Sequence, residues 1–329
     1  MSRSWGARVA RWGLLGGASV AGGLAVRASR RVAAMETLTP EAAAPGGTFA
    51  TVDGLRVRYL EAGPPDAPAL VLIHGFGGMA ETWGAVMGRL AGEYRLIAPD
   101  LPGFGYSERS SAPIFTLRRR AEGIVALLDH LGIGRATLVG NSMGGAVALQ
   151  TAYSFPERVD RLVLADAVAG YDGKGTSPSP LLGEVLRRTP LGKILLTTLF
   201  YDDARAAKLV GAMYYDRGRF TPQMQAHYLR PRRVRGSLDS LLALTATRAD
   251  DNLPTGIAAI ATPTLILWGQ DDRLVGPAYA ERLHADLRDS RVVLIPDCGH
   301  LPQEERPDAF VAALRGFLTG TASPPARVA

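Results

Sequence analysis

The sequence predicts an α/β fold in which helices cover both faces of a mostly parallel sheet, with a helical cap inserted into it. Eight short runs of strand type recur along the 329 residues, and from residue 69 onward they alternate with segments of helical periodicity. Such alternation is typical of parallel sheets that are covered on both faces. It lapses between residues 168 and 255, where helical fragments separated by prolines predict the cap.

This pattern divides the chain into five segments. The core is expected in two parts, residues 48–167 and 256–318, with the cap over 168–255 between them. Residues 1–35 have the composition of a signal or anchor segment. The tail over 319–329 is rich in small and polar residues, and we expect it to be disordered.

Each core element has its own signal. Residues 48–53 and 55–61 alternate like the strands of a hairpin, with Asp53-Gly54 as the turn. Further strands are expected at 69–73, 94–98, 136–139, 161–165, 264–268 and 291–295. Helices are expected at 79–90, 116–131, 146–153, 277–287 and 306–318. The helix over 116–131 places six apolar side chains on one face: Leu117, Ala121, Ile124, Val125, Leu128 and Leu131.

The composition suits a soluble globular enzyme, with 47% hydrophobic and 21% charged residues. The net charge of +6 comes mainly from arginine, which clusters at residues 118–120 and 230–233. We expect these clusters on solvated helix faces and loop ends, because no nucleic-acid-binding module accompanies them. Cys298 is the single cysteine, which excludes an internal disulfide and a thiol metal site. No metal-binding cluster or nucleotide fingerprint occurs, so we expect no cofactor.

The N-terminus resembles a membrane-directed segment. The uncharged run Trp12–Val26 lies between arginines and has 15 residues, five of them glycine. That length is typical of a signal-peptide core and falls short of the ~18–20 residues that span a bilayer. Because arginines also follow the run, we expect a membrane anchor or an uncleaved signal. The alternatives are an exported protein, or a cytoplasmic one in which Met35 is the true start.

The motif with the clearest chemistry is Gly140-Asn141-Ser142-Met143-Gly144, which reads G-x-S-x-G between a strand and an alanine-rich helix. A serine on such a sharp strand-to-helix turn is a nucleophile elbow. Side chains at positions 140 and 144 would collide with the neighbouring strand and helix. Ser142 is therefore the candidate nucleophile.

Ser142 needs a base and an orienting carboxylate. His300 lies on a loop after the last strand, where an imidazole can take the serine proton and return it to the leaving group. The loop after the preceding strand offers Asp271 and Asp272, of which we choose Asp272. Asp166, which ends an earlier strand, is expected to have a structural or cap-hinge role. Three other histidines are expected at the surface: His130, His227 and His284.

An oxyanion hole requires two backbone N–H groups aimed at the developing negative charge. Met143, the residue after the nucleophile, is one candidate. The glycine-rich loop His74-Gly75-Phe76-Gly77-Gly78 follows the third strand, and we assign the second N–H to Phe76. We expect His74 to orient this loop by hydrogen bonding. The lysine and the glycine spacing of phosphate-binding loops are absent.

Together these motifs resemble the α/β-hydrolase superfamily, whose triad order is also Ser…Asp…His. The resemblance covers residues 48–318 and rests on five landmarks: the 74–78 loop, Asp100-Leu101-Pro102-Gly103-Phe104-Gly105, the elbow, residues 269–272 and Gly299-His300. Phe76 and the Asn-Ser-Met elbow are similar to bacterial esterases and lipases and to monoacylglycerol-lipase-like enzymes. Meta-cleavage-product hydrolases share the elbow. Dehalogenases and epoxide hydrolases would carry aspartate in place of Ser142.

The resemblance implies hydrolysis of carboxylic esters through an acyl-enzyme on Ser142, with a small and apolar acyl compound as substrate. Carbon–carbon hydrolysis of a vinylogous diketone is the rival reaction, and acyl transfer or perhydrolysis would use the same site. A binding protein that has lost the chemistry is a further alternative. Six cap residues are expected either to line the acyl pocket or to form the core of the cap: Leu181, Leu182, Leu195, Leu196, Leu199 and Met213.

Overall fold

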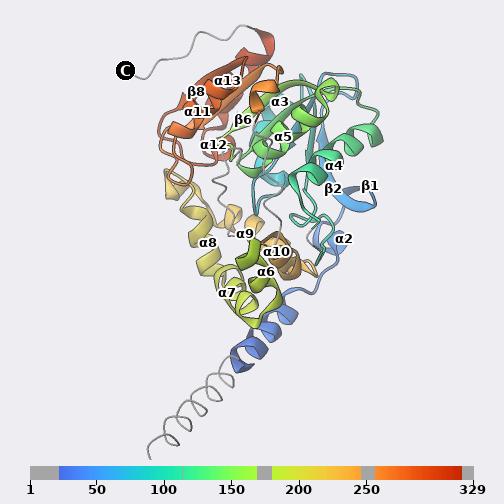
Figure 1. Ribbon diagram of the computed structural model, residues 1–329, viewed down its shortest axis with the longest axis vertical. Coiled ribbons are helices and arrows are strands. Elements are labelled where there is room, and N and C mark those ends of the chain that lie inside the picture. Colours follow the sequence, from blue (N-terminus) through green and yellow to red (C-terminus); the bar gives the residue numbers. More distant parts are fainter. Residues whose placement is uncertain (1–21, 113, 169–179, 246–255, 321–329) are drawn as a thin grey trace, which may run out of the picture.

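The computed structural model describes residues 22–112, 114–168, 180–245 and 256–320, and a single eight-stranded sheet forms its centre (Figure 1). The strands are β1 (Thr48–Val52), β2 (Leu55–Ala62), β3 (Ala69–Ile73), β4 (Arg95–Pro99), β5 (Ala136–Asn141), β6 (Val159–Ala165), β7 (Thr264–Gly269) and β8 (Ser290–Ile295). Their order is β1-β2-β4-β3-β5-β6-β7-β8. Only β2 runs antiparallel to its neighbours β1 and β4, so the predicted mostly parallel sheet is confirmed.

Both faces of the sheet are buried, as the sequence predicted. Along β3, Val71 and Ile73 enter one apolar layer and Leu70 and Leu72 enter the other, following the two-residue period of a strand. Helices α4 (Leu117–His130), α5 (Met143–Ser154) and α11 (Ala278–Asp286) contribute to the first layer. The second layer receives η1 (Ala80–Trp83), α3 (Gly84–Leu90) and α13 (Pro307–Thr319). The tail beyond residue 320 lies outside the described residues.

The parallel strands bring the predicted site residues to one edge of the sheet. Strands β3, β5, β6, β7 and β8 run in the same direction, so their carboxyl ends lie at the same edge. His74 follows β3, Ser142 follows β5, Asp166 follows β6, Asp272 follows β7 by three residues and His300 follows β8 by five. Ligands of open α/β sheets bind at this edge.

The cap between β6 and β7 is helical. It contains α6 (Pro180–Arg188), α7 (Pro190–Phe200), α8 (Asp203–Gly211), η3 (Arg217–Arg219), α9 (Pro222–Leu229), η4 (Arg230–Arg233) and α10 (Ser237–Thr245). The prolines that break the sequence pattern are the first residues of three of these helices, where a missing N–H costs nothing. Leu196, Tyr201, Leu238 and Leu242 form the centre of an apolar cluster inside the cap.

The N-terminal part of the described chain packs on this cap (Figure 1). Residues 22–35 form a helix whose Val32 and Met35 contact the apolar cluster of the cap. Glu36 accepts hydrogen bonds from the backbone N–H groups of Gly236 and Leu238. No helix in the described ranges is both long enough and apolar enough to cross a membrane. Most of the run Trp12–Val26 lies outside those ranges.

The two basic clusters are only partly solvated. The Arg118 side chain is 81% exposed, whereas Arg120 is buried, donates its Nε–H to the carbonyl of Phe115 and lies over the ring of that residue. Arg232 is also largely covered and pairs with Asp203. The prediction of solvated faces is therefore wrong for Arg120 and Arg232, because a guanidinium group can be buried where carbonyls and aromatic faces surround it.

Candidate active site

Ser142 lies on a strained turn between β5 and α5. Its backbone has φ 53° and ψ −120°, outside the regions that L-residues favour. The turn is tight, since a Cβ on Gly140 would lie 2.3 Å from the carbonyl oxygen of Gly144, and a Cβ on Gly144 would lie 2.2 Å from that of Ile73. The steric need for glycine at both positions is thus confirmed. Non-glycine strain of this kind concentrates at functional sites.

The residue before the serine connects the turn to the histidine loop. The Asn141 side-chain amide donates to the backbone carbonyls of Ala165 and His300, at 3.1 Å each. The N–H of Ser142 donates to the same Ala165 carbonyl, at 2.9 Å. Asn141 therefore holds the ends of β5 and β6 and the backbone of His300 at fixed separations. Its position inside the elbow motif was the only sequence signal for this role.

His300 and Asp272 form a buried pair. The Nδ1 of His300 lies 2.7 Å from Oδ2 of Asp272, and both side chains are at most 2% exposed. The other carboxylate oxygen of Asp272 accepts the backbone N–H groups of Leu274 and Val275, which fixes its orientation. Asp271 is only half-buried, and its backbone N–H donates to the carbonyl of Cys298. Of the two neighbouring aspartates, it is thus Asp272 that contacts His300.

A third carboxyl group lies beside this pair. Asp166 is fully buried, has φ 46° and accepts the backbone N–H of Gly269 at 2.9 Å. Burial and the nearby Asp272 carboxylate raise the pKa of Asp166 well above its ordinary value, which favours its protonated form. Asp166, Asp272 and His300 offer ligand atoms within 4.8 Å of one another, as in a metal site. However, Nδ1 of His300 and Oδ2 of Asp272 already bind each other, and Oδ1 of Asp272 accepts two backbone N–H groups.

The loop after β3 lies against the nucleophile. A Cβ on Gly75 would approach the Cβ of Ser142 to 3.0 Å, which is tighter than ordinary packing, so a side chain there would push the loop away from the serine. Phe76 lines the same cavity as Ser142, and this residue is 47% exposed. Met143 is the first residue of α5, so its N–H belongs to the helix-terminal donors that lack an intrahelical partner. The two candidate oxyanion donors are thus next to the nucleophile along the chain, in the case of Met143, and on the loop that approaches it, in the case of Phe76.

His74 holds the 74–78 loop through hydrogen bonds made by both nitrogens of its ring. Its Nδ1 donates to the carbonyl of Gly75 at 2.7 Å, and its Nε2 accepts the backbone N–H of Leu101 at 2.9 Å. The predicted orienting role agrees with this geometry. Burial lowers the pKa of His74 to about 4, so the imidazole is neutral at physiological pH.

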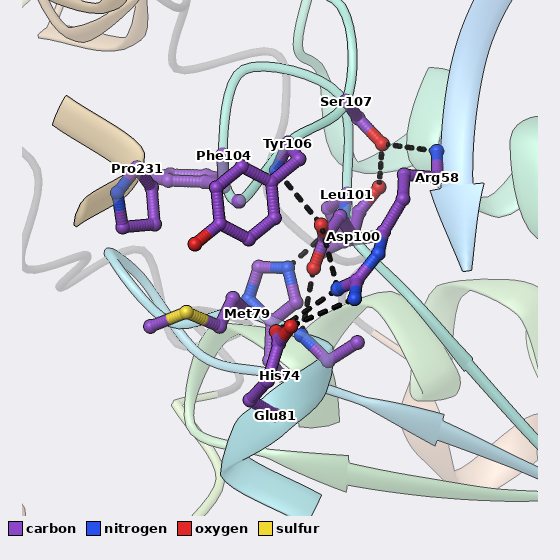
Figure 2. A network of polar contacts seen from close by, with 12 residues as sticks. Arg58, His74, Met79, Glu81, Asp100, Leu101, Phe104, Tyr106, Ser107 and Pro231 are labelled. Atoms are coloured by element: carbon purple, nitrogen blue, oxygen red, sulfur yellow. Dashed lines mark hydrogen bonds and ion pairs between the residues drawn. The ribbon is translucent and has the colours of Figure 1, made fainter. Parts of the chain in front are cut away.

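Figure 2 shows that polar contacts continue from His74, through the backbone of Leu101, to an ionic network around Asp100. The buried Asp100 accepts the backbone N–H groups of Ala80 and Tyr106 at 2.7 and 2.8 Å, and Arg58 lies 3.4 Å from it. Arg58 also pairs with Glu81 at 2.7 Å. The network joins β2, η1 and the turn after β4. It therefore stabilises the segments on both sides of the contact between His74 and Leu101.

Replacing His74 by glutamine is expected to make the free energy of unfolding depend less on pH between pH 7 and pH 5. The unfolded imidazole titrates near 6.5 and the folded one near 4, so this group's stabilisation is complete above pH 6.5 and is lost as the pH falls toward 4. Between pH 7 and pH 5 the loss is about 2 kcal/mol. Denaturant unfolding of both proteins at the two pH values measures it. An equal pH dependence in wild type and variant would contradict the assignment.

A cavity of about 740 Å³ opens above Ser142 and His300. Its volume lies within the range of small-molecule sites. The wall combines the core residues Phe76, Leu274 and Leu301 with cap residues, among them Leu209, Val210, Met213, Tyr228, Leu229 and Leu241. The cavity is therefore mainly apolar and lies between the two parts of the protein.

The cap residues expected at this wall mostly lie elsewhere. Met213 lines the cavity, but Leu196 belongs to the cap's own core, and Leu182 and Leu195 are exposed on its outside. Leu199 does not border the cavity, and the side chain of Leu181 lies outside the described residues. The helical pattern identified apolar cap residues, but the direction in which each helix faces depends on tertiary packing.

The cap also contacts the histidine loop directly. The N–H of His300 donates to the carbonyl of Met213 at 2.8 Å. The buried Glu305 carboxylate accepts the backbone N–H groups of Gly299 on one side and of Tyr215 and Asp216 on the other. Glu305 thus joins the cap to the loop of the base. Sequence reasoning missed this residue, because an acid five positions after a histidine has no distinctive pattern by itself.

Arg109 joins cap and core on the other side of the cavity. All five of its N–H donors are engaged, by the carbonyls of Phe104, Gly105, Ser107 and Pro231 and the hydroxyl of Ser237. Burial lowers the pKa of Arg109 to about 10, so the group stays charged at neutral pH. Although it lines the cavity, this arginine has no N–H left for a ligand.

The chain is similar to known hydrolases over most of its length. A family model described as the alpha/beta hydrolase fold matches residues 68–307. A hydrolase of unknown activity from Bacillus subtilis is 31% identical, over 84% of this chain and 99% of its own length. A 2-hydroxy-6-oxo-6-phenylhexa-2,4-dienoate hydrolase from Burkholderia cepacia is 31% identical, over 81% and 92%. The crystal structure of a membrane phospholipase A, a bacterial virulence factor, superposes with a TM-score of 0.67 at 28% identity, over 95% and 98%.

Proposed function

Since the chain belongs to the α/β-hydrolase family, we propose that it hydrolyses carboxylic esters through an acyl-enzyme on Ser142. His300 takes the proton of the Ser142 hydroxyl as the oxygen attacks the ester carbonyl, and then protonates the leaving alcohol. Asp272 holds the imidazole with Nδ1 protonated and stabilises its positive charge. The N–H groups of Phe76 and Met143 bind the oxyanion. Water, deprotonated by His300, then releases the acid.

The observation that carries this proposal is the coincidence of the buried His300–Asp272 pair with the strained Ser142 at one cavity. A strained backbone that presents a serine to the same cavity as an oriented imidazole has no evident structural use. The glycine at position 75 supports the same proposal, because it lets the loop approach Ser142, where its backbone N–H groups could bind the carbonyl oxygen of the substrate.

The cavity favours an apolar acyl group. Its wall is formed mainly by leucine, valine, methionine and aromatic side chains, and about 740 Å³ accommodates a chain of many methylene groups. The phospholipase A that this chain resembles over nearly its whole length also acts on esters, as its name states. We therefore propose medium- to long-chain acyl esters as the substrate class.

Carbon–carbon hydrolysis is the second candidate, supported by the 31% identity to the dienoate hydrolase. The substrate in that name carries a carboxylate, which would need a cationic partner in the cavity. Among the lining residues described, Arg109 has all its donors engaged, and Arg232 is paired with Asp203 and with backbone carbonyls. Arg217 and Arg273 are exposed side chains of the lining. These two arginines could reach a substrate carboxylate, so the preference for the ester rests on the apolar wall of the cavity.

A series of p-nitrophenyl esters of increasing acyl length tests the proposal against its rival. We expect kcat/KM to rise with chain length until the cavity is filled, because each buried methylene adds favourable transfer free energy. A vinylogous diketone acid assayed beside the esters should not be turned over. Turnover of the diketone without ester hydrolysis would replace the proposal by carbon–carbon hydrolysis. No labelling by a fluorophosphonate would instead indicate a binding protein.

We also propose that the N-terminal residues hold the protein at a membrane. Two observations support a membrane anchor. The uncharged run Trp12–Val26 lies between arginines, and the chain is similar to a protein described as a membrane phospholipase A. The helix over 22–35 must be kept in any test, because its Val32 and Met35 contact the cap. Cell fractionation tests this by comparing how much of the full chain, and of a variant that begins at residue 22, is found with the membranes. Equal solubility of the two would refute the anchor.

A further inference from the structure

Exposed apolar side chains gather at one end of the molecule. The distal cap surface, as we call it, consists of the helix over 22–35 and of α6, α7 and α8, which lie together in Figure 1. Eleven large apolar side chains are exposed in the described part of the chain, and seven belong to this surface. They are Leu24 and Val26 on the N-terminal helix, and Leu182, Val185, Leu191, Leu195 and Leu209 on the cap.

The exposed side chains of α6 and α7 lie on one face of each helix. Leu182 and Val185 are three positions apart on α6, and Leu191 and Leu195 are four apart on α7, so each pair shares a helix face. The exposed fractions of these four side chains run from 42% to 61%. Neighbouring residues of the same helices, such as Leu196, are buried in the cap core. The four exposed side chains are therefore not part of the core that holds the cap together.

The same surface concentrates positive charge. Residues 22–35 and 180–211 contain eight basic and three acidic residues, a net charge of +5 against +6 for the whole chain. The three acids are already engaged: Glu184 by Arg187 and Arg188, Asp202 by Arg31, and Asp203 by Arg232. Lys193 and Lys208 have no ion pair among the described residues. The surface thus combines uncompensated cations with exposed leucines.

We propose that the distal cap surface docks on an anionic phospholipid bilayer. Helices that present leucine and valine beside arginine and lysine are typical of interfacial binding, where apolar side chains enter the acyl boundary and cations pair with lipid phosphates. A partner that recognised the leucines alone would not require this excess of charge, and an acidic partner that recognised the charge alone would not require the leucines. The surface also reaches the active site, because Leu209 is both exposed on it and part of the cavity wall. Docking would bring the cavity beside the lipid. The inference is independent of the ester chemistry.

A dye at position 191 tests the contact in the full-length protein. Cys298 is fully buried, so a single cysteine introduced as Leu191→Cys can be labelled selectively with an environment-sensitive fluorophore. We expect a blue shift with vesicles of equal parts phosphatidylcholine and phosphatidylglycerol. The matched control Tyr153→Cys, exposed at the end of α5 in the core, should show none. The blue shift should persist in the variant that begins at residue 22, which separates docking of this surface from anchoring by residues 1–21.

Charge removal tests the lipid specificity. The triple variant Lys193→Gln, Arg205→Gln, Lys208→Gln should bind the anionic vesicles at least about tenfold more weakly and lose most of the salt dependence. Arg288→Gln with Arg291→Gln, exposed on the core, should bind like wild type. Hydrolysis of a soluble short-chain ester should be unchanged in all these variants, which separates a failure of docking from a failure of the active site.

Three results would overturn the proposal. The first is no spectral change at position 191 with anionic vesicles. The second is an equal change at positions 191 and 153. The third is a change at position 191 that appears without vesicles and grows with protein concentration, which would show that a second copy of the chain covers the surface.

Discussion

Replacing Ser142 by alanine is expected to lower kcat on p-nitrophenyl esters by at least about 10⁴-fold. The variant keeps the cavity, the His300–Asp272 pair and the oxyanion donors, and loses only the atom that forms the acyl-enzyme. Hydrolysis that persists would come from water activated by His300 next to the oxyanion hole. Steady-state rates and labelling by a fluorophosphonate measure the effect, and both should fall together.

The control for this variant is Ser154→Ala at the exposed end of the same helix, which should keep wild-type activity. Thermal unfolding of Ser142→Ala should also resemble that of wild type, since alanine and serine adopt the strained turn at similar cost. Ester hydrolysis at more than a small fraction of the wild-type rate would exclude Ser142 as the nucleophile. Water activated by His300 would then be the nucleophile.

Replacing Asp272 by asparagine is expected to lower kcat by about 10⁴-fold. An amide of the same shape can donate a hydrogen bond to Nδ1 of His300, which favours the tautomer that carries its proton on Nε2. That tautomer cannot accept the proton of Ser142. The neighbouring Asp271→Asn is the matched control and should retain nearly full activity, because Asp271 does not contact His300.

The neighbouring carboxyl of Asp166 makes a second experiment informative. If Asp272→Asn retained a large part of the activity, the double variant with Asp166→Asn would show whether Asp166 orients His300 in its place. A further large loss in the double variant would assign the orienting role to Asp166. Unchanged activity in both variants would show that His300 needs no carboxylate.

The fold was predictable from local patterns. The strand-type runs and the helical face over residues 116–131 reflect burial, and burial follows directly from the two-residue and 3.6-residue periods of strands and helices. The hairpin turn was also readable, because Asp53 and Gly54 both adopt positive φ and this residue pair tolerates it. The elbow was predictable for a steric reason, since only glycine fits at positions 140 and 144.

The supports of the site were not predictable in the same way. Asn141, Arg109 and Glu305 act through contacts with residues more than a hundred positions away, or with both cap and core. Arg120 belonged by sequence to a solvated cluster, but its guanidinium lies between aromatic rings that the chain supplies from other loops. None of these contacts leaves a periodic trace in the sequence.

The sequence by itself thus determined the order of elements, the turn that presents Ser142, and the loops that carry Phe76, Asp272 and His300, because these depend on residue type over short distances. Tertiary structure confirmed the choice of Asp272 over Asp271, and it alone decided which cap residues line the cavity and which face outward with the cap's positive charge. Those outcomes depend on how helices rotate and pack against one another. Packing is set by the whole chain at once, and no short segment records it.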